Sequence, residues 1–516
     1  MFIRKMAGSL HLLACAIVGG LVSAGHARPP NFVIVFADDF GFDLECFGSP
    51  TTRTVNINRM AAEGMKLTQW NTAHSICSPS RAAILTGRYA IRSGIFGNES
   101  TIQPHTGDHR VVHPSCYGHL PLDEVTIAEA LKPANYTSMA IGKWHLGYAY
   151  ENTTLLPVGH GFDYFYGTPV THCEGPPSYP AVPVFQNHEK VGRIGVDIVR
   201  EDLVYRYADQ ATQFISNNAN NSFFLYLAMD NTHSPVYSPA NFTSLRGPYG
   251  AATEALDWVV GQVMDTLTKM NLAQDTLVVF TSDNGAWYTP PPTQAGVVGP
   301  FQGTYAPQEL GYVDTGKGSS WEGGFRVPAV AWWPGTIAAG TVCENFTSSL
   351  DLFVTFLNLA GAPLPTGVAL DGKDISGILD PSGIHARLPH MPASKFENSG
   401  NYTFFYYRGP VLMAARSGAL KAHFITHSGF GHEVPVTHDP PLLFNVEVDP
   451  QERLPLEPAR YHAFISEITA AVEHHQSTVK PVTPQLDLID YKAMDCVGLS
   501  EKQSGCCMQL AGKCTY

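Results

Sequence analysis

A cysteine stands at the start of a helical stretch between Ile76 and Gly94, and an arginine follows it four residues later. Pro79 is typical of a first helical turn, so Cys77 is expected at the N-terminal end, where free N–H groups and the helix dipole favour an anion. Arg81 should lie on the same face of the helix. A cysteine in this position is expected to ionise easily, whereas the alternative is a buried structural cysteine. The combination of helix start, anion site and fixed cation favours chemistry over packing.

Oxygen-bearing side chains follow two apolar, strand-like segments. Asp38 and Asp39 follow the first segment, and Asp283 and Asn284 follow the second. Ca²⁺ and Mg²⁺ prefer oxygen ligands, whereas zinc prefers nitrogen or sulfur. Three carboxylates placed together would repel one another strongly unless a cation lay between them. Either motif alone could be an ordinary turn or helix cap, but together they predict a metal site.

Lysine and histidine side chains from further segments extend this set. Lys143 and His145 lie two residues apart in an extended segment, so they should point the same way. His233 follows another apolar segment, and the glycines around Lys317 would allow that lysine to approach a bound group closely. A metal, a nucleophile and several cations together suit an ester of a tetrahedral oxyanion.

The elements that must position these side chains repeat in the order strand, polar end, helix, strand. This order predicts an α/β fold with a large mixed, mainly parallel sheet sandwiched by helices. Ligands of such sheets bind beyond the carboxyl ends of the strands, and each polar cluster falls at such an end. From about residue 375 the sequence predicts a smaller α+β domain with an antiparallel sheet, followed by a helix over 458–476.

Length and composition indicate a globular chain of two domains. The chain has 516 residues, of which 44% are hydrophobic and 15% charged, and its formal net charge is −13. An acidic chain has no electrostatic reason to bind nucleic acid or anionic lipid. We expect a catalytic domain over 28–374 and a C-terminal α+β domain with a Cys-rich tail over 375–516.

The N-terminus has the pattern of a secretory signal peptide over residues 1–27. Arg4 and Lys5 precede an apolar stretch from Ser9 to Val22, and small residues then precede Arg28. The apolar stretch is short for a bilayer, so a membrane anchor is the less favoured alternative and no membrane span is expected. A lysosomal or secreted protein is predicted.

Sequons and cysteines agree with a secretory route. N-x-S/T sequons occur at Asn98, Asn135, Asn152, Asn220, Asn241, Asn345 and Asn401. Eight cysteines remain besides Cys15 and Cys77, namely Cys46, Cys116, Cys173, Cys343, Cys496, Cys506, Cys507 and Cys514. The last four are expected to form disulfides among themselves, with zinc binding as the alternative. The sequence leaves the pairing of Cys46, Cys116, Cys173 and Cys343 open, and Cys116 with Cys173 is one candidate pair.

Several of these segments resemble one enzyme family. The segment CSPSRAAILTGR resembles the C-x-P-x-R signature of the sulfatases, and FADDFG, GKWHLG, NTHSP, TSDNG and GKGSSWEGGFRVPA resemble the family's other site segments in the same order. The resemblance runs from about Asn31 into the C-terminal domain. It is strongest to the lysosomal group that includes N-acetylgalactosamine-6-sulfatase and arylsulfatase A. The region from Asn98 to His119 matches neither of these, and it should line the pocket.

The resemblance implies an alkaline-phosphatase-like fold and a sulfuric ester hydrolase. It implies that a formylglycine-generating enzyme converts Cys77 to formylglycine, whose hydrate is the nucleophile. One Ca²⁺ would be bound by Asp38, Asp39, Asp283 and Asn284 together with the modified residue 77.

Substrate contacts are also implied by the resemblance. Arg81 would hold the hydrate and His145 would assist it. Lys143 and Lys317 would clamp the sulfate oxygens, and His233 would contact the sulfate and the leaving oxygen. Thr171 and His172 match a substrate-facing segment. A disulfide cysteine of the family is replaced by Thr315 here.

The substrate favoured by the resemblance is a 6-sulfated galactosamine or galactose residue, and a sulfated lipid or aryl ester is the alternative. Histidines that must be protonated favour an acidic pH optimum. A homodimer is a further expectation. The rival interpretations are a phosphatase or phosphodiesterase on a related scaffold and a glycan-binding relative without turnover.

Overall fold

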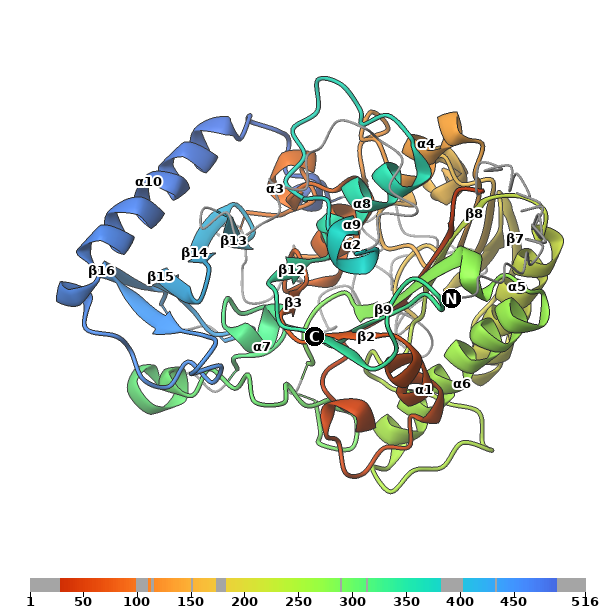
Figure 1. The fold of residues 1–516 in the computed structure, drawn as a ribbon, viewed down its shortest axis with the longest axis horizontal. Helices are drawn as coiled ribbons and strands as arrows, with labels where there is room; N and C mark the ends of the chain where they lie inside the picture. The colour runs from red at the N-terminus through yellow and green to blue at the C-terminus, as the bar shows by residue number, and fades with distance from the viewer. Residues whose placement is uncertain are drawn as a thin grey trace, which may run out of the picture.

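The computed structural model covers the whole chain (Figure 1) and describes most of it. The described residues are 28–98, 110–112, 116–149, 152–172, 182–287, 290–311, 314–381, 402–431 and 434–489. Within them, a large domain built on one sheet carries a smaller domain with its own sheet, which lies at the left of Figure 1.

The large sheet has ten strands in the order β11-β2-β10-β9-β1-β8-β4-β5-β6-β7. Its central strands β9, β1, β8, β4 and β5 are parallel, whereas β10, β6 and β7 run antiparallel to their neighbours. The predicted mixed, mainly parallel sheet is therefore confirmed. Its strands are β1 (Asn31–Ala37), β2 (Met65–Leu67), β4 (Thr137–Lys143), β5 (Tyr164–Thr168), β6 (Pro183–Gln186), β7 (Glu189–Arg193), β8 (Phe223–Ala228), β9 (Thr276–Ser282), β10 (Ala329–Trp332) and β11 (Thr341–Cys343).

Helices cover both faces of this sheet, which is why β1, β8 and β9 read as continuous apolar segments. On one face lie α1 (Val55–Glu63), α5 (Leu203–Asn217) and α6 (Pro248–Lys269), whose apolar sides share a core with alternate residues of the central strands. On the other face lie α2 (Cys77–Thr86), α4 (Ile127–Leu131) and α8 (Asp351–Ala360). The layers are visible in Figure 1, where α5 and α6 lie at the right and α2 and α8 at the centre.

The register of the central strands decides where the polar side chains meet. Phe36 of β1 is paired with Ala228 of β8, and Ala37 is paired with Ser282 of β9. All three strands therefore end at one level of the same sheet edge. The residues that directly follow them leave the sheet together, and these are the polar segments singled out in the sequence.

The smaller domain is an antiparallel sheet covered by one long helix. It consists of β13 (Thr403–Arg408), β14 (Val411–Ser417), β15 (Leu420–Thr426), β16 (Val436–Asn445) and α10 (His462–Thr478). This confirms the predicted C-terminal antiparallel sheet. Ile375 and Leu379, which flank and end the short helix α9 (Ser376–Leu379), still pack in the core of the large domain.

The small sheet shares an apolar core with helices and loops of the large domain. Phe325 of the short helix α7 (Glu322–Phe325) packs its ring 4.7 Å from that of Tyr406 in β13. Residues near α3 (Ala90–Ser93) join the same apolar cluster. A further pair of short strands, β3 (Trp70–Asn71) and β12 (Thr347–Ser348), lies beside this junction. Motion of one domain relative to the other would expose this core.

A buried group of charged side chains also crosses the junction. Glu322 of α7 accepts a hydrogen bond from Lys421 Nζ of β15 at 3.0 Å, and both side chains are inaccessible to solvent. Glu452 accepts from His423 at 2.7 Å, from Lys421 at 3.0 Å and from the backbone N–H of Glu322 at 2.6 Å. These bonds tie the segment that follows Lys317 to the smaller domain.

Several sequence predictions concern residues outside the described part. They include the signal peptide over 1–27, the sequon at Asn401, the C-terminal cysteines and Cys173. Among the described cysteines, Cys46, Cys77, Cys116 and Cys343 are free thiols, and Cys173, the candidate partner of Cys116, lies outside the described residues. No helix among the described residues is long and apolar enough to cross a membrane.

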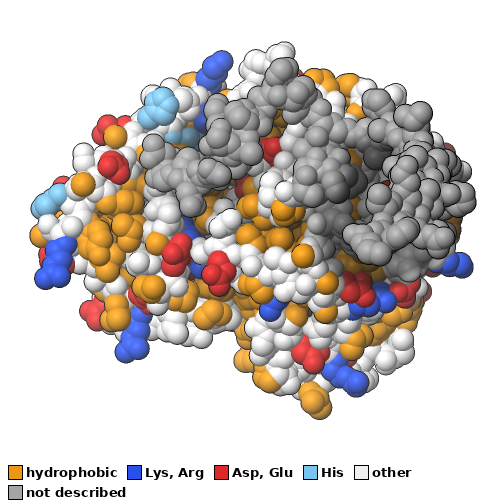
Figure 2. Space-filling model, viewed as in Figure 1, with side chains coloured by type: hydrophobic (Ala, Val, Ile, Leu, Met, Phe, Trp, Pro, Cys, Tyr) orange, Lys and Arg blue, Asp and Glu red, His pale blue; other side chains and the backbone are white. Residues whose placement is uncertain are grey.

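Acidic and basic side chains are interspersed on the surface. On the described part of the face in Figure 2, Lys and Arg side chains lie scattered among Asp and Glu and do not gather into one basic patch. This distribution agrees with the net charge of −13.

Candidate active site

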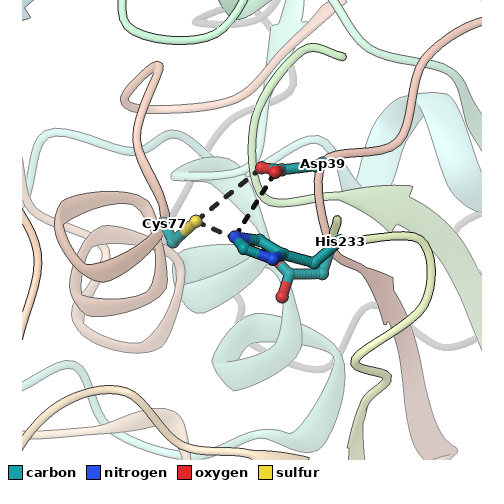
Figure 3. A group of neighbouring side chains, drawn as sticks. Asp39, Cys77 and His233 are labelled. Atoms are coloured by element: carbon teal, nitrogen blue, oxygen red, sulfur yellow. Dashed lines mark hydrogen bonds and ion pairs between the residues drawn. The ribbon is translucent and has the colours of Figure 1, made fainter. Parts of the chain in front are cut away.

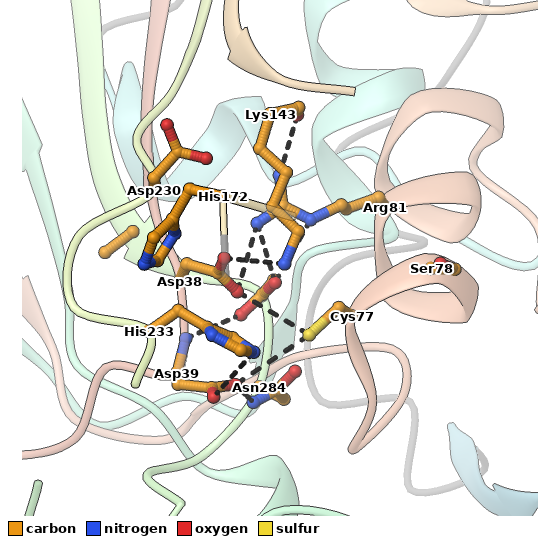
Figure 4. Close-up of polar contacts among 12 residues, drawn as sticks. Asp38, Asp39, Cys77, Ser78, Arg81, Lys143, His172, Asp230, His233 and Asn284 are labelled. Carbon is orange, nitrogen blue, oxygen red and sulfur yellow. Dashed lines mark hydrogen bonds and ion pairs between the residues drawn. The ribbon is translucent and has the colours of Figure 1, made fainter. Parts of the chain in front are cut away.

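The carboxyl ends of β1, β4, β8 and β9 and the first turn of α2 surround one buried polar cluster (Figure 4). Asp38 and Asp39 directly follow β1, and Asp283 and Asn284 directly follow β9. Lys143 ends β4, and His233 lies in the connection after β8. The structure thus brings together the residues that the sequence predicted from separate segments.

Asp38 is held by two cations. Lys143 Nζ donates to its Oδ2 at 2.6 Å, and Arg81 Nη2 lies 3.4 Å from its Oδ1. Burial raises the pKa of the Asp38 carboxyl, but Lys143 and Arg81 outweigh burial and hold this pKa well below its usual value. Asp38 is therefore ionised in this setting.

Arg81 joins helix α2 to the ends of two strands. Its Nε and Nη2 donate to Asp283 Oδ2 at 3.1 and 2.7 Å, and its Nη1 donates to the backbone carbonyl of Lys143 at 3.0 Å. Burial and the neighbouring Asp38 raise the pKa of Asp283 to about 7 despite Arg81. Crowded carboxylates of this kind are relieved when a divalent cation enters.

Asp39 forms the second half of the cluster. Lys317 Nζ donates to its Oδ2 at 2.8 Å, Asn284 Nδ2 donates to its Oδ1 at 2.7 Å, and its backbone N–H donates to Asp283 Oδ1 at 3.1 Å. The backbone of Asp39 has a φ of 54°, in the left-handed region, which is uncommon for residues other than glycine. The chain therefore makes a tight turn directly after β1. The turn carries the Asp39 carboxylate back toward residue 77.

Cys77 is the first residue of α2, and its thiol faces the Asp39 carboxylate and the His233 ring in Figure 3. Its Sγ lies 3.5 Å from Asp38 Oδ1 and 3.8 Å from Asp39 Oδ1. The expectation that this cysteine ionises easily is wrong. Burial raises the pKa of the Cys77 thiol well above its usual value, and the nearby Lys143 and Lys317 do not offset it. An unmodified Cys77 would be a poor nucleophile.

His145 and His233 lie beside this thiol. Both ring nitrogens of His145 are buried and have no hydrogen-bond partner among the described residues. His233 Nε2 lies 3.5 Å from both Asp39 Oδ2 and Lys317 Nζ. Burial lowers the pKa of His233 to about 4, and Asp39 offsets burial only in part. A protonated His233 near neutral pH would therefore require a bound anion.

The two residues assigned to a substrate-facing segment differ in position. Thr171 lines the cavity in front of Cys77. His172 instead packs behind His233, with the two ring centroids 5.8 Å apart, and its Nε2 lies 3.0 Å from the backbone carbonyl of Pro235. His172 is thus placed to orient His233 and does not line the cavity.

The donor set fits a hard cation. Asp38 and Asp39 supply its carboxylate oxygens, in a group with Cys77 and His233 whose ligand atoms all lie within 4.8 Å of one another. Asn284 Oδ1 is buried without a hydrogen-bond partner among the described residues, although its amide nitrogen is used. A buried amide oxygen beside two carboxylates is the kind of donor that Ca²⁺ binds.

The sequence did not point to the apolar part of the cavity. Besides Cys77, His145, Thr171, His233 and Lys317, the cavity is lined by Ile76, Val111, Trp287 and Phe430. Val111 confirms that the unmatched segment 98–119 reaches the pocket. Trp287 lies three residues after the predicted site residue Asn284, and this closeness in sequence was the only signal that it reaches the cavity. Phe430 comes from the smaller domain, and no such signal marked it.

Comparison with known proteins agrees with this geometry over nearly the whole chain. The Sulfatase family profile matches residues 30–362, and the profile for the C-terminal region of aryl-sulfatase matches residues 399–516. The chain belongs to the sulfatase family. This sulfatase is therefore a sulfuric ester hydrolase, as the sequence resemblance implied.

Curated relatives of this sulfatase act on different sulfate esters. It is 37% identical to human N-acetylgalactosamine-6-sulfatase, covering 92% of this chain and 91% of the human protein. It is 36% identical to human arylsulfatase A, covering 86% of each protein. It is 33% identical to human steryl-sulfatase, covering 89% of this chain and 90% of that enzyme.

Solved structures show the same fold. The PsFucS1 sulfatase from Pseudoalteromonas sp. superposes with a TM-score of 0.71 at 24% identity, covering 90% of this chain and 92% of that chain. The structure of Ps i-CgsB gives a TM-score of 0.65 at 26% identity, covering 89% of this chain and 94% of that one.

Proposed function

We propose that this sulfatase removes the 6-sulfate of a galactosamine or galactose residue, with formylglycine at position 77 and one Ca²⁺ beside it. The observation that carries the mechanism is the placement of the Cys77 thiol at the buried start of α2, against Asp38 and Asp39. The position is right for a nucleophile, but the raised pKa of the thiol makes cysteine itself unsuitable.

Charge balance supports a cation at this place. Three carboxylates meet three cationic side chains in the cluster: Asp38, Asp39 and Asp283 against Arg81, Lys143 and Lys317. A sulfate ester would add a negative charge and compete for the lysines that now neutralise Asp38 and Asp39. A divalent ion held by Asp38, Asp39, Asp283, Asn284 and residue 77 would neutralise these carboxylates in place of the lysines and leave the lysines free for the sulfate.

The cations of the chain have distinct tasks in this proposal. Lys143 and Lys317 enter the cluster from β4 and from the segment before α7, and they would bind sulfate oxygens and stabilise the charge that develops on them. Arg81 fixes the position of residue 77 relative to Asp283, because it bonds Asp283 from the same helix. All three cations are buried in one cluster, so they lie close to the place where the charge would develop.

The histidines supply proton transfer. His233 lies next to Lys317 and would give a proton to the leaving oxygen once a bound sulfate raises its pKa. His145 has two unused ring nitrogens beside residue 77 and would take a proton from the nucleophilic hydroxyl. When present, formylglycine supplies a hydrated aldehyde with two hydroxyls, and Ca²⁺ supplies Lewis-acid stabilisation of the oxyanion.

The names of the relatives support the proposed substrate, and the sequence features of the secretory route support the proposed location. The name of the 37% identical relative specifies a 6-sulfate on N-acetylgalactosamine, which supports a galactosamine or galactose ester. The alternative is a sulfated lipid or aryl ester, supported by the 36% identity to arylsulfatase A. A signal peptide over 1–27, glycosylation at exposed sequons such as Asn152 and Asn241, and a lysosomal or secreted location complete the proposal.

The proposal is tested by comparing hydrolysis of nitrophenyl sulfate, nitrophenyl phosphate and galactose 6-sulfate by the purified protein. We expect both sulfate esters to be hydrolysed and the phosphate to be a much poorer substrate. A Cys77→Ala variant should lose activity on all three. Preferred hydrolysis of the phosphate would replace this proposal with a phosphatase function.

A further inference from the structure

One side of the cavity is an apolar wall made of Val111, Trp287 and Phe430. These side chains are only half-buried, whereas the catalytic residues at the floor are buried. The polar floor accounts for the sulfate, but it offers nothing to the group that the sulfate is attached to. The wall is the part of the cavity that the sulfate chemistry leaves unexplained.

Trp287 stands directly against the residues assigned to the sulfate. Lys317 Nζ lies 5.0 Å from the centroid of its ring, and the ring centroid of His233 lies 6.0 Å away. His233 is placed to meet the leaving oxygen, so the carbon attached to that oxygen must pass beside Trp287. The Trp287 Nε1–H is buried and has no acceptor among the described residues.

Phe430 extends this wall from the smaller domain. It lies in the connection between β15 and β16, and its ring centroid is 5.5 Å from that of Trp287, with an angle of 38° between the planes. The Arg110 guanidinium lies 4.3 Å from the centroid of the Phe430 ring. The Phe430 ring is thus held between the Arg110 guanidinium and the Trp287 ring.

The backbone around Phe430 is fixed as well. Arg110 Nη1 donates to the carbonyl of Gly429 at 2.6 Å, and the Gly429 N–H donates to the carbonyl of Asp314 at 2.8 Å. A Cβ at Gly429 would lie 2.3 Å from the carbonyl oxygen of Lys317, so only glycine permits this approach of the two loops. The position of Phe430 and the position of Lys317 are therefore coupled.

We propose that Trp287 and Phe430 form a binding platform for the sugar ring that carries the sulfate, an inference that rests on the proposed sulfatase function. Two rings inclined to each other do not form a parallel slot for a flat aryl or steroid group. They suit a puckered pyranose, whose C–H groups pack on an aromatic face while its hydroxyls reach polar groups at the edge. Thr171 is a polar residue that lines the same cavity.

The test compares Trp287→Ala and Phe430→Ala with the wild type. It measures kcat/KM on galactose 6-sulfate and on nitrophenyl sulfate, and the inhibition constant of inorganic sulfate. We expect kcat/KM for galactose 6-sulfate to fall by about tenfold, because loss of one aromatic stacking partner has effects of that order. The inhibition constant of inorganic sulfate should change by less than about twofold, since the sulfate contacts remain. Trp287→Phe should recover most of the activity on the sugar ester.

Tyr164→Ala serves as the matched control, because Tyr164 is an aromatic residue with 48% of its surface exposed and is absent from the residues that line the described cavity. A thermal unfolding curve of each variant separates misfolding from loss of binding, and Phe430→Leu replaces Phe430→Ala if the latter unfolds. Unchanged kcat/KM on galactose 6-sulfate, or a larger loss on nitrophenyl sulfate than on the sugar ester, would overturn the platform alone. A wild type that hydrolyses no sulfate ester would overturn the proposed function, and the platform with it.

Discussion

Arg81 binds Asp283 through two nitrogens, with Nε at 3.1 Å and Nη2 at 2.7 Å from the same carboxylate oxygen. Both side chains are inaccessible to solvent. This pair connects the helix that begins at Cys77 to the strand that ends beside Asp283. The nucleophile position and the proposed metal site are therefore held at a fixed separation by one buried ion pair.

Arg81→Lys is expected to lower both kcat and stability. A lysine cannot bond Asp283, Asp38 and the Lys143 carbonyl at once, and it leaves part of a buried charge network unsatisfied. We expect kcat to fall by about a hundredfold and the free energy of unfolding to fall by about 3 kcal/mol. Activity assays and urea unfolding measure the two effects.

The control for this variant is Arg59→Lys. Arg59 pairs with Asp265 at the same 2.7 Å distance, but the two side chains are 38% and 62% exposed. An exposed pair contributes about 0–1 kcal/mol, so this variant should behave as wild type. Equal effects of the two substitutions would contradict the role given to the Arg81–Asp283 pair.

Removal of Ca²⁺ is expected to reduce activity and thermal stability together. A ligand that binds only the folded state raises the free energy of unfolding by about 2.7 kcal/mol at a hundred times its dissociation constant. Dialysis against a chelator, followed by titration with Ca²⁺, should therefore lower and then restore both Tm and kcat. Asn284→Ala should require more Ca²⁺ for the same recovery. A Tm that does not respond to the chelator or to Ca²⁺ would count against the metal site.

Gly429→Ala is expected to impair catalysis from outside the catalytic domain. Its Cβ would meet the backbone oxygen of Lys317 at 2.3 Å, so the Lys317 segment must move. We expect a fall of about tenfold in kcat/KM, because small displacements of positioned groups have effects of this order or larger.

Gly377→Ala is the matched control, because a Cβ there meets no atom within 4 Å. It should leave kcat/KM and Tm unchanged. If Gly429→Ala leaves kcat/KM unchanged as this control does, the proposed coupling between the Phe430 loop and Lys317 is contradicted.

Glu322 is expected to make the domain junction sensitive to strong acid. Burial raises the pKa of Glu322, but Lys421 and Arg416 outweigh burial and lower the pKa to about 2 from an ordinary value of 4.5. Because this pKa is lower in the folded state than in the unfolded one, the stabilisation is complete above pH 4.5. It is lost as the pH falls from 4.5 toward 2, and by linkage it is of the order of 3 kcal/mol.

Urea unfolding of the wild type and of Glu322→Gln between pH 2 and 7 tests this prediction. The variant should be less stable than the wild type at pH 5 to 7, and the difference should shrink in the acid range. Parallel pH dependences of the two proteins would show that Glu322 does not titrate as stated.

Much of the polar site could be predicted from the sequence, because neighbouring parallel strands have their carboxyl ends on the same side of the sheet. Asp38, Asp283 and His233 each follow an apolar strand, so their convergence followed from fold class and motif order. Local sequence also predicted the start of α2 at Cys77. These features depend on contacts that repeat in every parallel sheet.

Other features depend on packing between distant segments and were not visible in the sequence. The ionisation of Cys77 was predicted wrongly, because the helix start favours a thiolate whereas burial, which requires the complete fold, opposes it more strongly. Phe430 reaches the cavity from the smaller domain, and no spacing in the chain relates it to Trp287. Thr171 lines the cavity, whereas the adjacent His172 packs against His233, and the sequence alone does not tell which of the two side chains faces the cavity.

The most direct measurement is mass spectrometry of the tryptic peptide that contains residue 77, which lies between the cleavage sites Lys66 and Arg81. Protein made in cells with a formylglycine-generating enzyme should give the mass expected for an aldehyde in place of the thiol, and activity should scale with the converted fraction. Fully active protein in which residue 77 is entirely cysteine would contradict the account.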